Sequence, residues 1–271
     1  MVLGLVLAIA AILGSNLLDG GTFSSLINPS AAMLVLGGTI GATAVSSQLS
    51  DLLSMPRLVL DIMRPPKADL RAEIERMVAL AVKARRNGLL SLEEEIADLE
   101  DPFLTRGLQM VVDGADADTV RGVLQTEMAL RRRSDARQAA MFDAAGGFAP
   151  TMGIIGTVMG LIHVLANLAD VNKLGPSIAT AFLATFYGIT TANVLWLPIA
   201  NKMKQNARFA SIRAEVGLEG VLSIQAGDNP SAVRDKLTVF LQGSDATAPA
   251  AAQGEAAPGG EGGDDGRNQV A

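Results

Sequence analysis

Four long stretches of this chain contain no charged side chain, and they constrain its fold more than any other feature. They are residues 1–18, 20–50, 144–169 and 174–201. Each is long enough to cross a bilayer, which requires roughly 20 mostly apolar residues. Only 18% of the 271 residues are charged, against about a quarter in an ordinary soluble domain. The pattern predicts an all-α membrane protein with four transmembrane helices and excludes an ordinary soluble enzyme.

The charges between these stretches predict how the chain crosses the membrane. Asp19 separates the first two stretches, and Asp170 and Lys173 separate the last two. Cations gather on the other side, at Arg57, Arg64, Lys67, Arg131, Arg132, Arg133, Arg137, Lys202, Lys204, Arg208 and Arg213. Because Lys and Arg accumulate in cytoplasmic loops, both termini are expected in the cytoplasm. A cleaved signal peptide is the alternative for 1–18, but that segment lacks a basic start and an A-x-A site.

The polar regions divide the rest of the chain. We expect transmembrane helices 1 and 2 in 1–50, a helical cytoplasmic insertion in 51–143 and transmembrane helices 3 and 4 in 144–201. A cytoplasmic helical segment then occupies 202–243. Residues 244–271 are rich in Ala, Gly, Pro and acidic residues, a composition that predicts a disordered tail.

Local signals predict the helices of the insertion. Apolar spacing indicates a helix over 68–86, which ends at Asn87-Gly88. Ser91 and Glu94 have capping-box spacing, so they predict a second helix, which Pro102 closes before a third helix over 103–112. From Asp116 or Asp118, one long helix is expected to run into the third span. The fourth span is expected to continue likewise through 202–226.

Small residues predict where the membrane helices approach closely. Gly153, Gly156 and Gly160 lie near one face of the third span, and helices in lipid associate through such faces. Further small residues are Gly37, Gly38 and Gly41 in the second span and Ala181, Ala184, Thr185 and Gly188 in the fourth. Either these faces pack within one bundle, which the spacing favours, or they form a surface for a second protein.

The spans contain no Asp, Glu, Lys or Arg. A protein that moves protons needs a titratable relay in the membrane, so either this chain conducts no ion or a partner supplies the carboxylate. His163 follows Gly156 by seven residues and is expected on the same face, more as a packed or hydrogen-bonded side chain than as a proton carrier. Pro150 is either the tolerated start of a membrane helix or a kink that faces a pore.

Composition excludes several kinds of chemistry. The chain has no cysteine and one histidine, so we expect no disulfide, no metal centre and no other cofactor. It has neither a Ser/His/Asp set nor a phosphate-binding loop, which argues against an enzyme. A net charge of −6 does not suit a nucleic-acid binder.

Several motifs together carry a family resemblance. They are Ala149–Leu161 (APTMGIIGTVMGL), Ile178–Gly188 (IATAFLATFYG), Leu197–Lys202 (LPIANK), Asn28–Ser30, Val35–Thr39, Gly220–Gln225 and Asn229-Pro230. With these motifs, residues 1–243 resemble the flagellar motor stator A-subunit family, most of all the PomA/MotP branch of the MotA proteins. The third-span motif is shared with ExbB and TolQ, so four spans, the insertion and the 220–230 motif define the stator type.

The resemblance implies a homo-oligomer, a pentamer, around two copies of a MotB/PomB-type single-span subunit whose membrane aspartate carries the ion. It implies a multi-pass protein of the bacterial inner membrane, in contact with lipid. The third and fourth spans would line the partner and the ion path, which strengthens the second interpretation of Gly153, Gly156 and Gly160. Pro150 and Pro198 match family prolines, the first of which is linked with coupling ion binding to movement.

The resemblance also implies a contact with the flagellar rotor, through its switch complex. Arg85, Arg86, Glu93 and Glu94 match the family's torque-generating charges. A further acid of the PomA pattern falls on Ile96, and Glu95 is acidic instead. Without the family, these charges would be interpreted as solvated helix ends.

Thr157 and Thr185 match the threonine positions typical of sodium-driven stators. A hard cation prefers oxygen ligands, and hydroxyls supply them without added charge. Ala184 replaces a third threonine of that pattern, and proton-driven ExbB relatives also keep threonines. Sodium is therefore favoured as the transported ion, with protons as the alternative.

Two other functions stay open. One is an ExbB/TolQ-like energiser of an envelope transport system, which typically has three spans and an external N-terminus. The other is a membrane scaffold without ion flux.

Overall fold

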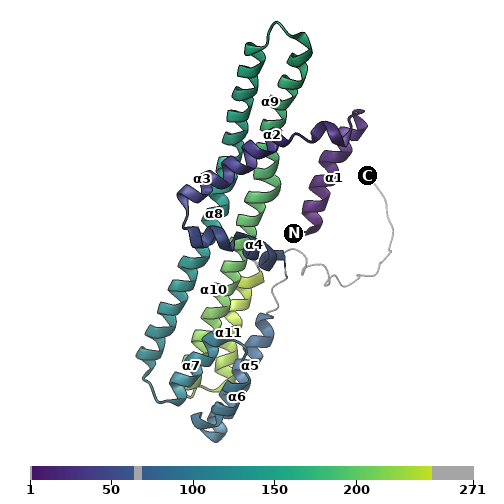
Figure 1. The fold of residues 1–271 in the computed structure, drawn as a ribbon. Coiled ribbons are helices and arrows are strands. Elements are labelled where there is room, and N and C mark those ends of the chain that lie inside the picture. Colours follow the sequence, from purple (N-terminus) through teal and green to yellow (C-terminus); the bar gives the residue numbers. More distant parts are fainter. Residues whose placement is uncertain (1, 64–68, 246–271) are drawn as a thin grey trace, which may run out of the picture.

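Two long helical rods dominate the structure, a computed structural model that describes residues 2–63 and 69–245. The first is helix α8, Ala117–Ala166, of 50 residues. The second consists of α9, Val171–Thr191, one π-helical turn, Ala192–Trp196, and α10, Leu197–Gln225. The two rods form a hairpin that runs the length of the molecule (Figure 1). The prediction that the last two spans continue as long helices is thus confirmed.

The apolar end of the molecule contains the remaining N-terminal helices. They are α1, Val2–Leu18, α2, Pro29–Ala32, and α3, Gly38–Ser46, with a 3₁₀ turn at Phe23–Leu26 and a π-helical turn at Met33–Gly37. Helix α4, Leu49–Met63, crosses the long rods (Figure 1). Asn28 caps α2, since its side chain accepts a hydrogen bond from the Ala31 N–H, and Pro29 occupies the first helical position.

Three of the four predicted spans are long and apolar enough to cross a membrane. They lie in the helices Phe23–Ser46, Ala117–Ala166 and Leu174–Gln225. The fourth apolar helix, Leu3–Leu18, is shorter. At 1.5 Å per residue, the 17 residues of α1 extend about 25 Å, slightly less than the hydrocarbon thickness of about 30 Å. The described fold is all-helical, with three long apolar helices and one short one.

The charged end of the molecule is a helical domain with its own core. Helices α5, Leu70–Asn87, α6, Glu93–Ala97, α7, Pro102–Val112, and α11, Pro230–Asp245, pack around the lower parts of α8 and α10 (Figure 1). Their core includes Met77, Leu92, Leu108, Leu124, Val221 and Leu237, none of which is exposed. Asp69, Asp101 and Asp116 cap the starts of α5, α7 and α8, as expected for acids at helix N-termini.

The predicted capping box at Ser91 is wrong. Ser91 lies in a 3₁₀ turn, Leu89–Leu92, and its hydroxyl donates a hydrogen bond to the Gly88 carbonyl at 2.7 Å rather than capping α6. Helix α6 stops at Ala97, and Pro102 opens α7 instead of closing the preceding helix. Both differences follow from local competition: a serine can bond nearby backbone groups, and proline is well suited to the first helical turn. Of the predicted tail, 244–271, Ser244 and Asp245 are the last residues of helix α11, and the rest lies outside the described residues.

Candidate functional site

Helices α8 and α9 approach so closely that side chains are excluded between them. A Cβ added to Gly156 would lie 2.4 Å from the Ala184 Cβ, and one added to Gly160 would lie 2.5 Å from the Ala181 Cβ. One added to Gly153 would lie 2.9 Å from the Ala184 carbonyl oxygen. The three predicted glycines are buried against α9 of the same chain. They therefore pack within the described chain, as the first of the two interpretations expects.

The contact is reciprocal. A Cβ on Gly188 of α9 would lie 2.6 Å from the Ala149 carbonyl oxygen and 3.2 Å from the Pro150 Cα. Pro150 is half-buried inside α8, and because proline has no N–H, the Gly146 carbonyl loses its usual helical donor. Glycine on the facing helix leaves room at this interrupted turn.

Two hydroxyls meet between α8 and α9, in the apolar half of the hairpin. The Thr157 Oγ1 contacts the Thr185 Oγ1, and both side chains are half-buried. Thr157 Oγ1 also lies 3.1 Å from the Gly153 carbonyl oxygen and 3.2 Å from that of Ala181. We call these two hydroxyls and two carbonyls the oxygen cluster. It offers several neutral oxygens without a charge, the kind of ligand that hard cations accept.

The hairpin has one covered face and one open face. Helices α2 and α3 cover the first: a Cβ on Gly38 would meet the Met152 sulfur at 2.7 Å, and Leu183 and Tyr187 pack with Ala31 and Val35. Tyr187 also accepts a hydrogen bond from the Asn28 N–H at 2.9 Å. Gly37 and Gly41 have no neighbour within 4 Å of an added Cβ, so only Gly38 makes the close contact predicted for the second span.

The open face carries the oxygen cluster and large apolar side chains. On α8, Pro150, Ile154, Thr157 and Leu161 follow the i, i+4, i+7, i+11 spacing of one helix face. On α9, Ile178, Phe182, Thr185 and Ile189 have the same spacing. Phe182 is 69% exposed and Ile154 58%. Such a patch is suited to lipid or to another apolar helix.

Pro198 follows a change in helix geometry. The Leu197 N–H bonds to the Ala192 carbonyl, five residues back, in the π-helical turn between α9 and α10. Pro198 has no N–H to continue the ladder, and the wider turn accommodates it at the start of α10. The proline therefore lies at a local irregularity between the apolar and charged halves of the rod.

His163 forms a hydrogen bond, one of the two environments expected for it, but within the described chain it is not packed against another helix. His163 is exposed, and its Nδ1 hydrogen-bonds to the Met159 carbonyl at 2.9 Å. Seven residues are about two helical turns, so His163 stays on the side of Gly156, but its side chain is exposed, whereas Val164 and Asn167 are half-buried. The expected hydrogen bond is present, but it lies within its own helix.

The predicted rotor-facing charges lie at the opposite end of the molecule, between α5 and α6 (Figure 1). Arg85, Arg86, Glu93 and Glu94 are exposed. Lys83 lies 2.8 Å from Glu95 and 3.8 Å from Glu94, and the hydrogen bond that Lys83 donates to the Glu95 carboxylate raises the pKa of Lys83. Among the described residues, Arg85, Arg86 and Glu93 have no ion-pair partner. Ile96, at the position of the further acid, is buried in the core.

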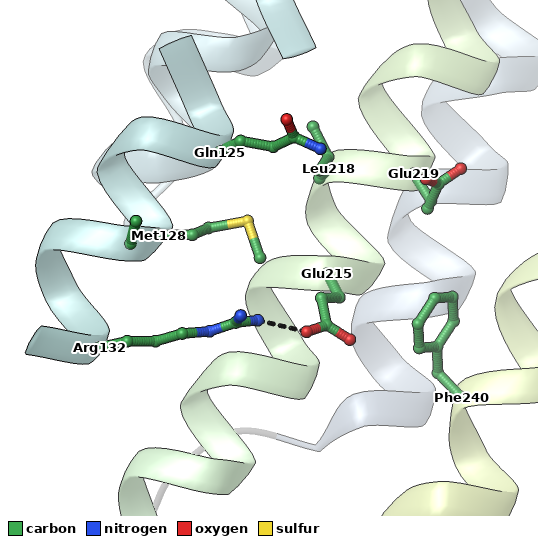
Figure 2. A pocket seen from close by; sticks show the side chains of 8 residues that line it. Gln125, Met128, Arg132, Glu215, Leu218, Glu219 and Phe240 are labelled. Atoms are coloured by element: carbon green, nitrogen blue, oxygen red, sulfur yellow. Dashed lines mark hydrogen bonds and ion pairs between the residues drawn. The ribbon is translucent and has the colours of Figure 1, made fainter. Parts of the chain in front are cut away.

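A cavity of about 440 Å³ lies between α8, α10 and α11 (Figure 2). Arg132 on one wall pairs with Glu215 on the other and bonds the Ser211 hydroxyl at 2.6 Å. Glu219 pairs with Lys236 at 2.8 Å and with Arg121 at 3.7 Å. The charges around this cavity are matched by the chain itself. Within the described ranges, no cluster of three or more His, Asp or Glu residues could hold a metal ion.

Comparison with known proteins identifies the chain. It matches the MotA/TolQ/ExbB proton channel family over residues 95–215 and Motility protein A N-terminal over residues 2–88. It is 37% identical to Motility protein A of Bacillus subtilis (strain 168), over 90% of each chain. It is 30% identical to Chemotaxis protein PomA of Vibrio alginolyticus, over 88% of this chain and 93% of that one.

A solved structure agrees with these matches. The flagellar MotAB stator complex from Bacillus subtilis contains a chain with a TM-score of 0.84 and 36% identity, over 91% of this chain and 97% of that one. The chain therefore belongs to the MotA/TolQ/ExbB proton channel family. Its N-terminal region is of the motility protein A type. The family is one of channel subunits, so the chain is not an enzyme. The relatives that the chain matches include both motility protein A and PomA.

The glycine contact makes a testable prediction. Gly156→Ala should force α8 and α9 apart and destabilise the hairpin by about 1–3 kcal/mol, as overpacking does. Ala184→Gly in the same chain should restore much of the loss, because it removes the methyl group that the new Cβ meets. Thermal unfolding of the detergent-solubilised protein measures both effects. Gly147→Ala is the matched control, since its Cβ would meet nothing within 4 Å. Equal stability of Gly156→Ala and Gly147→Ala would contradict the close contact.

Proposed function

We propose that this chain is the stator A subunit of a bacterial flagellar motor and, with a MotB/PomB-type single-span partner, converts ion flow into torque. The oxygen cluster carries the proposal: it supplies neutral oxygens on an open helical face but no carboxylate. A carrier of ions through the membrane needs a titratable group there, and a membrane aspartate of the partner provides it. The likeness to the B. subtilis MotAB stator complex supports such a partner.

The open face of the hairpin is the proposed partner surface. Gly153, Gly156 and Gly160 are covered by α9, so their proposed part in partner packing is indirect, by setting the spacing of the two helices. The direct contacts fall on Ile154 and Leu161 of α8 and on Phe182 of α9, which are exposed beside the threonines. An apolar single-span helix matches this face, because lipid-exposed helices associate through close packing.

The proposed assembly is a pentamer around two partner chains in the bacterial inner membrane. In this arrangement α1 is the first of four membrane helices. Both termini and the α5–α7 domain are cytoplasmic. The distribution of Lys and Arg supports this orientation. Exposed apolar side chains such as Leu3, Leu7 and Leu18 of α1 leave surface for lipid and for neighbouring copies.

Co-purification tests the proposed partnership. The chain and a single-span protein with a membrane Asp, co-expressed in membranes, should purify as one complex with several copies of this chain. A tag at Met1 should be accessible only from the cytoplasmic side. An external tag would favour an ExbB/TolQ-like energiser, and failure to bind any such partner would favour a scaffold without ion flux.

Arg85, Arg86, Glu93 and Glu94 are proposed to act on the rotor switch complex. Three of these charges have no partner in the described chain, so they are available to another protein. Arg85→Glu should reduce torque without lowering the amount of protein in the membrane, and a single change should weaken it only partly, because exposed pairs contribute about 0–1 kcal/mol each. Tethered-cell rotation measures torque, with Arg71→Glu at the other end of α5 as control. Normal torque after all four charges are neutralised would contradict the assignment.

Pro150 is proposed to couple ion binding to movement, and Pro198 to share this role at the π-helical turn. Pro150→Leu should close the interruption in α8 by restoring an N–H for the Gly146 carbonyl. The variant should reach the membrane and assemble, yet fail to drive rotation. Membrane fractionation and tethered-cell rotation separate the two effects. Loss of the protein from the membrane would show that the proline is needed for folding instead.

The transported ion is proposed to be sodium. The Thr157 and Thr185 hydroxyls and the carbonyls beside them supply oxygens suited to a hard cation, whereas a proton requires only the partner's carboxylate and a water path. Swimming speed at fixed pH should fall as external sodium is replaced by potassium. Thr157→Val should raise the sodium concentration needed for half-maximal speed, while Thr151→Val, an exposed hydroxyl bonded to its own helix, should not. Speed that is indifferent to sodium would mean protons and leave the threonines as packing residues.

A further inference from the structure

Arg213 joins three elements of the cytoplasmic domain. From α10, its Nε donates to Glu73 on α5, and its Nη2 lies 2.8 Å from the Asp101 carboxylate. The Glu73 side chain is only 8% exposed, that of Asp101 19% and that of Arg213 34%. Asp101 also accepts the Phe103 N–H at 3.0 Å as the cap of α7, which fixes its position. The guanidinium thus holds two carboxylates that are themselves anchored to different helices.

The two carboxylates lie on either side, in sequence, of the charged segment that we propose to contact the rotor. Glu73 lies in the first turn of α5, and Asp101 follows the end of α6. Between them the chain forms the helix that ends in Arg85 and Arg86 and the turn that leads to Glu93. We call residues 73–101 the rotor-facing segment. Arg213 therefore binds this segment at both of its ends.

Arg213 is also connected to the membrane site through one rod. Helix α10 continues from α9 through the π-helical turn, without a loop. Thr185 of the oxygen cluster precedes Arg213 by 28 residues in the numbering, about 40 Å along a helix. A displacement or rotation of the rod at the membrane is thus carried to Arg213 through helical backbone, because the π-helical turn and Pro198 join α9 to α10 without a loop.

The cluster depends on the guanidinium. Burial raises the pKa of the Glu73 carboxyl, the hydrogen bond and charge of Arg213 lower it, and the charge of Asp101 raises it. Without Arg213, the Glu73 and Asp101 carboxylates would repel each other, and neither end of the rotor-facing segment would be bound to α10 at this point. Lysine keeps the charge but lacks the planar set of donors that bonds two carboxylates in fixed directions.

We propose that Arg213 is a positioning residue that couples movement of α10 to the rotor-facing segment. This inference rests on the proposed stator function. It assigns to Arg213 the transmission of force, rather than the binding of an ion or of the rotor. Mutations along a coupling element change coupling by about 0.5–2 kcal/mol, or roughly two- to thirtyfold, so the predicted effect is large enough to measure.

The test separates ion flow from torque. Arg213→Lys is expressed with the partner, and three quantities are measured: the complex in the membrane, ion uptake into vesicles, and torque per bound stator in a rotation assay with fluorescent counting. We expect normal assembly, ion uptake within about twofold of wild type and torque lower by about threefold or more. Arg234→Lys is the matched control, because Arg234 pairs with Glu75 on the same helix α5 from α11 and is more exposed.

A second variant keeps the test valid if Arg213→Lys folds poorly. Glu73→Gln with Asp101→Asn removes the two carboxylate charges, leaves hydrogen-bond acceptors at both positions and keeps a good N-cap. This double variant should likewise lower the torque per stator while leaving ion uptake close to that of wild type. Uptake and torque that fall in proportion in these variants, or torque per stator equal to that of Arg234→Lys, would overturn the role of Arg213. No uptake or torque from the wild-type chain with its partner would instead contradict the proposed function.

Discussion

The close approach of α8 and α9 is the interaction on which the rest of the structure depends. Lipid gives two apolar helices no hydrophobic reason to associate, so backbone contact must hold them together. Gly153, Gly156 and Gly160 provide that contact against the small residues of α9. The same spacing brings Thr157 and Thr185 within contact of each other. Packing and the arrangement of oxygens at the candidate ion path therefore have one cause.

The membrane also explains why the apolar spans contain no carboxylate. Charged groups within a bilayer are costly and are kept only where they function, and the apolar spans contain none. The open face of the hairpin offers hydroxyls and carbonyls but no titratable group. The proposed function assigns the missing carboxylate to the membrane helix of the partner. The charged domain lies at the other end of the same rods, which continue through the π-helical turn without a loop.

Sequence reasoning succeeded where strong local signals decide the structure. The charge-free stretches identified the apolar helices, and the scarcity of stop signals from Asp116 to Gly146 predicted one long helix running into the third span, which is α8, of 50 residues. It failed where neighbours compete: Ser91 bonds to Gly88 instead of capping α6, and Pro102 opens α7 instead of closing the preceding helix. The covered face of the hairpin and the link from Arg213 to Glu73 join residues far apart in the chain, and no local pattern specifies them.

Cysteine cross-linking tests the central claim, that the open face of the hairpin receives the partner's ion-carrying helix. The chain has no cysteine of its own, so single cysteines are unambiguous. Ile154→Cys and Phe182→Cys, on the open face, should each form a disulfide with a cysteine placed one turn from the partner's membrane aspartate. Ile155→Cys, which is also exposed but lies toward the other flank of α8, should not. Cross-links from Ile155→Cys with none from Ile154→Cys or Phe182→Cys would contradict the account.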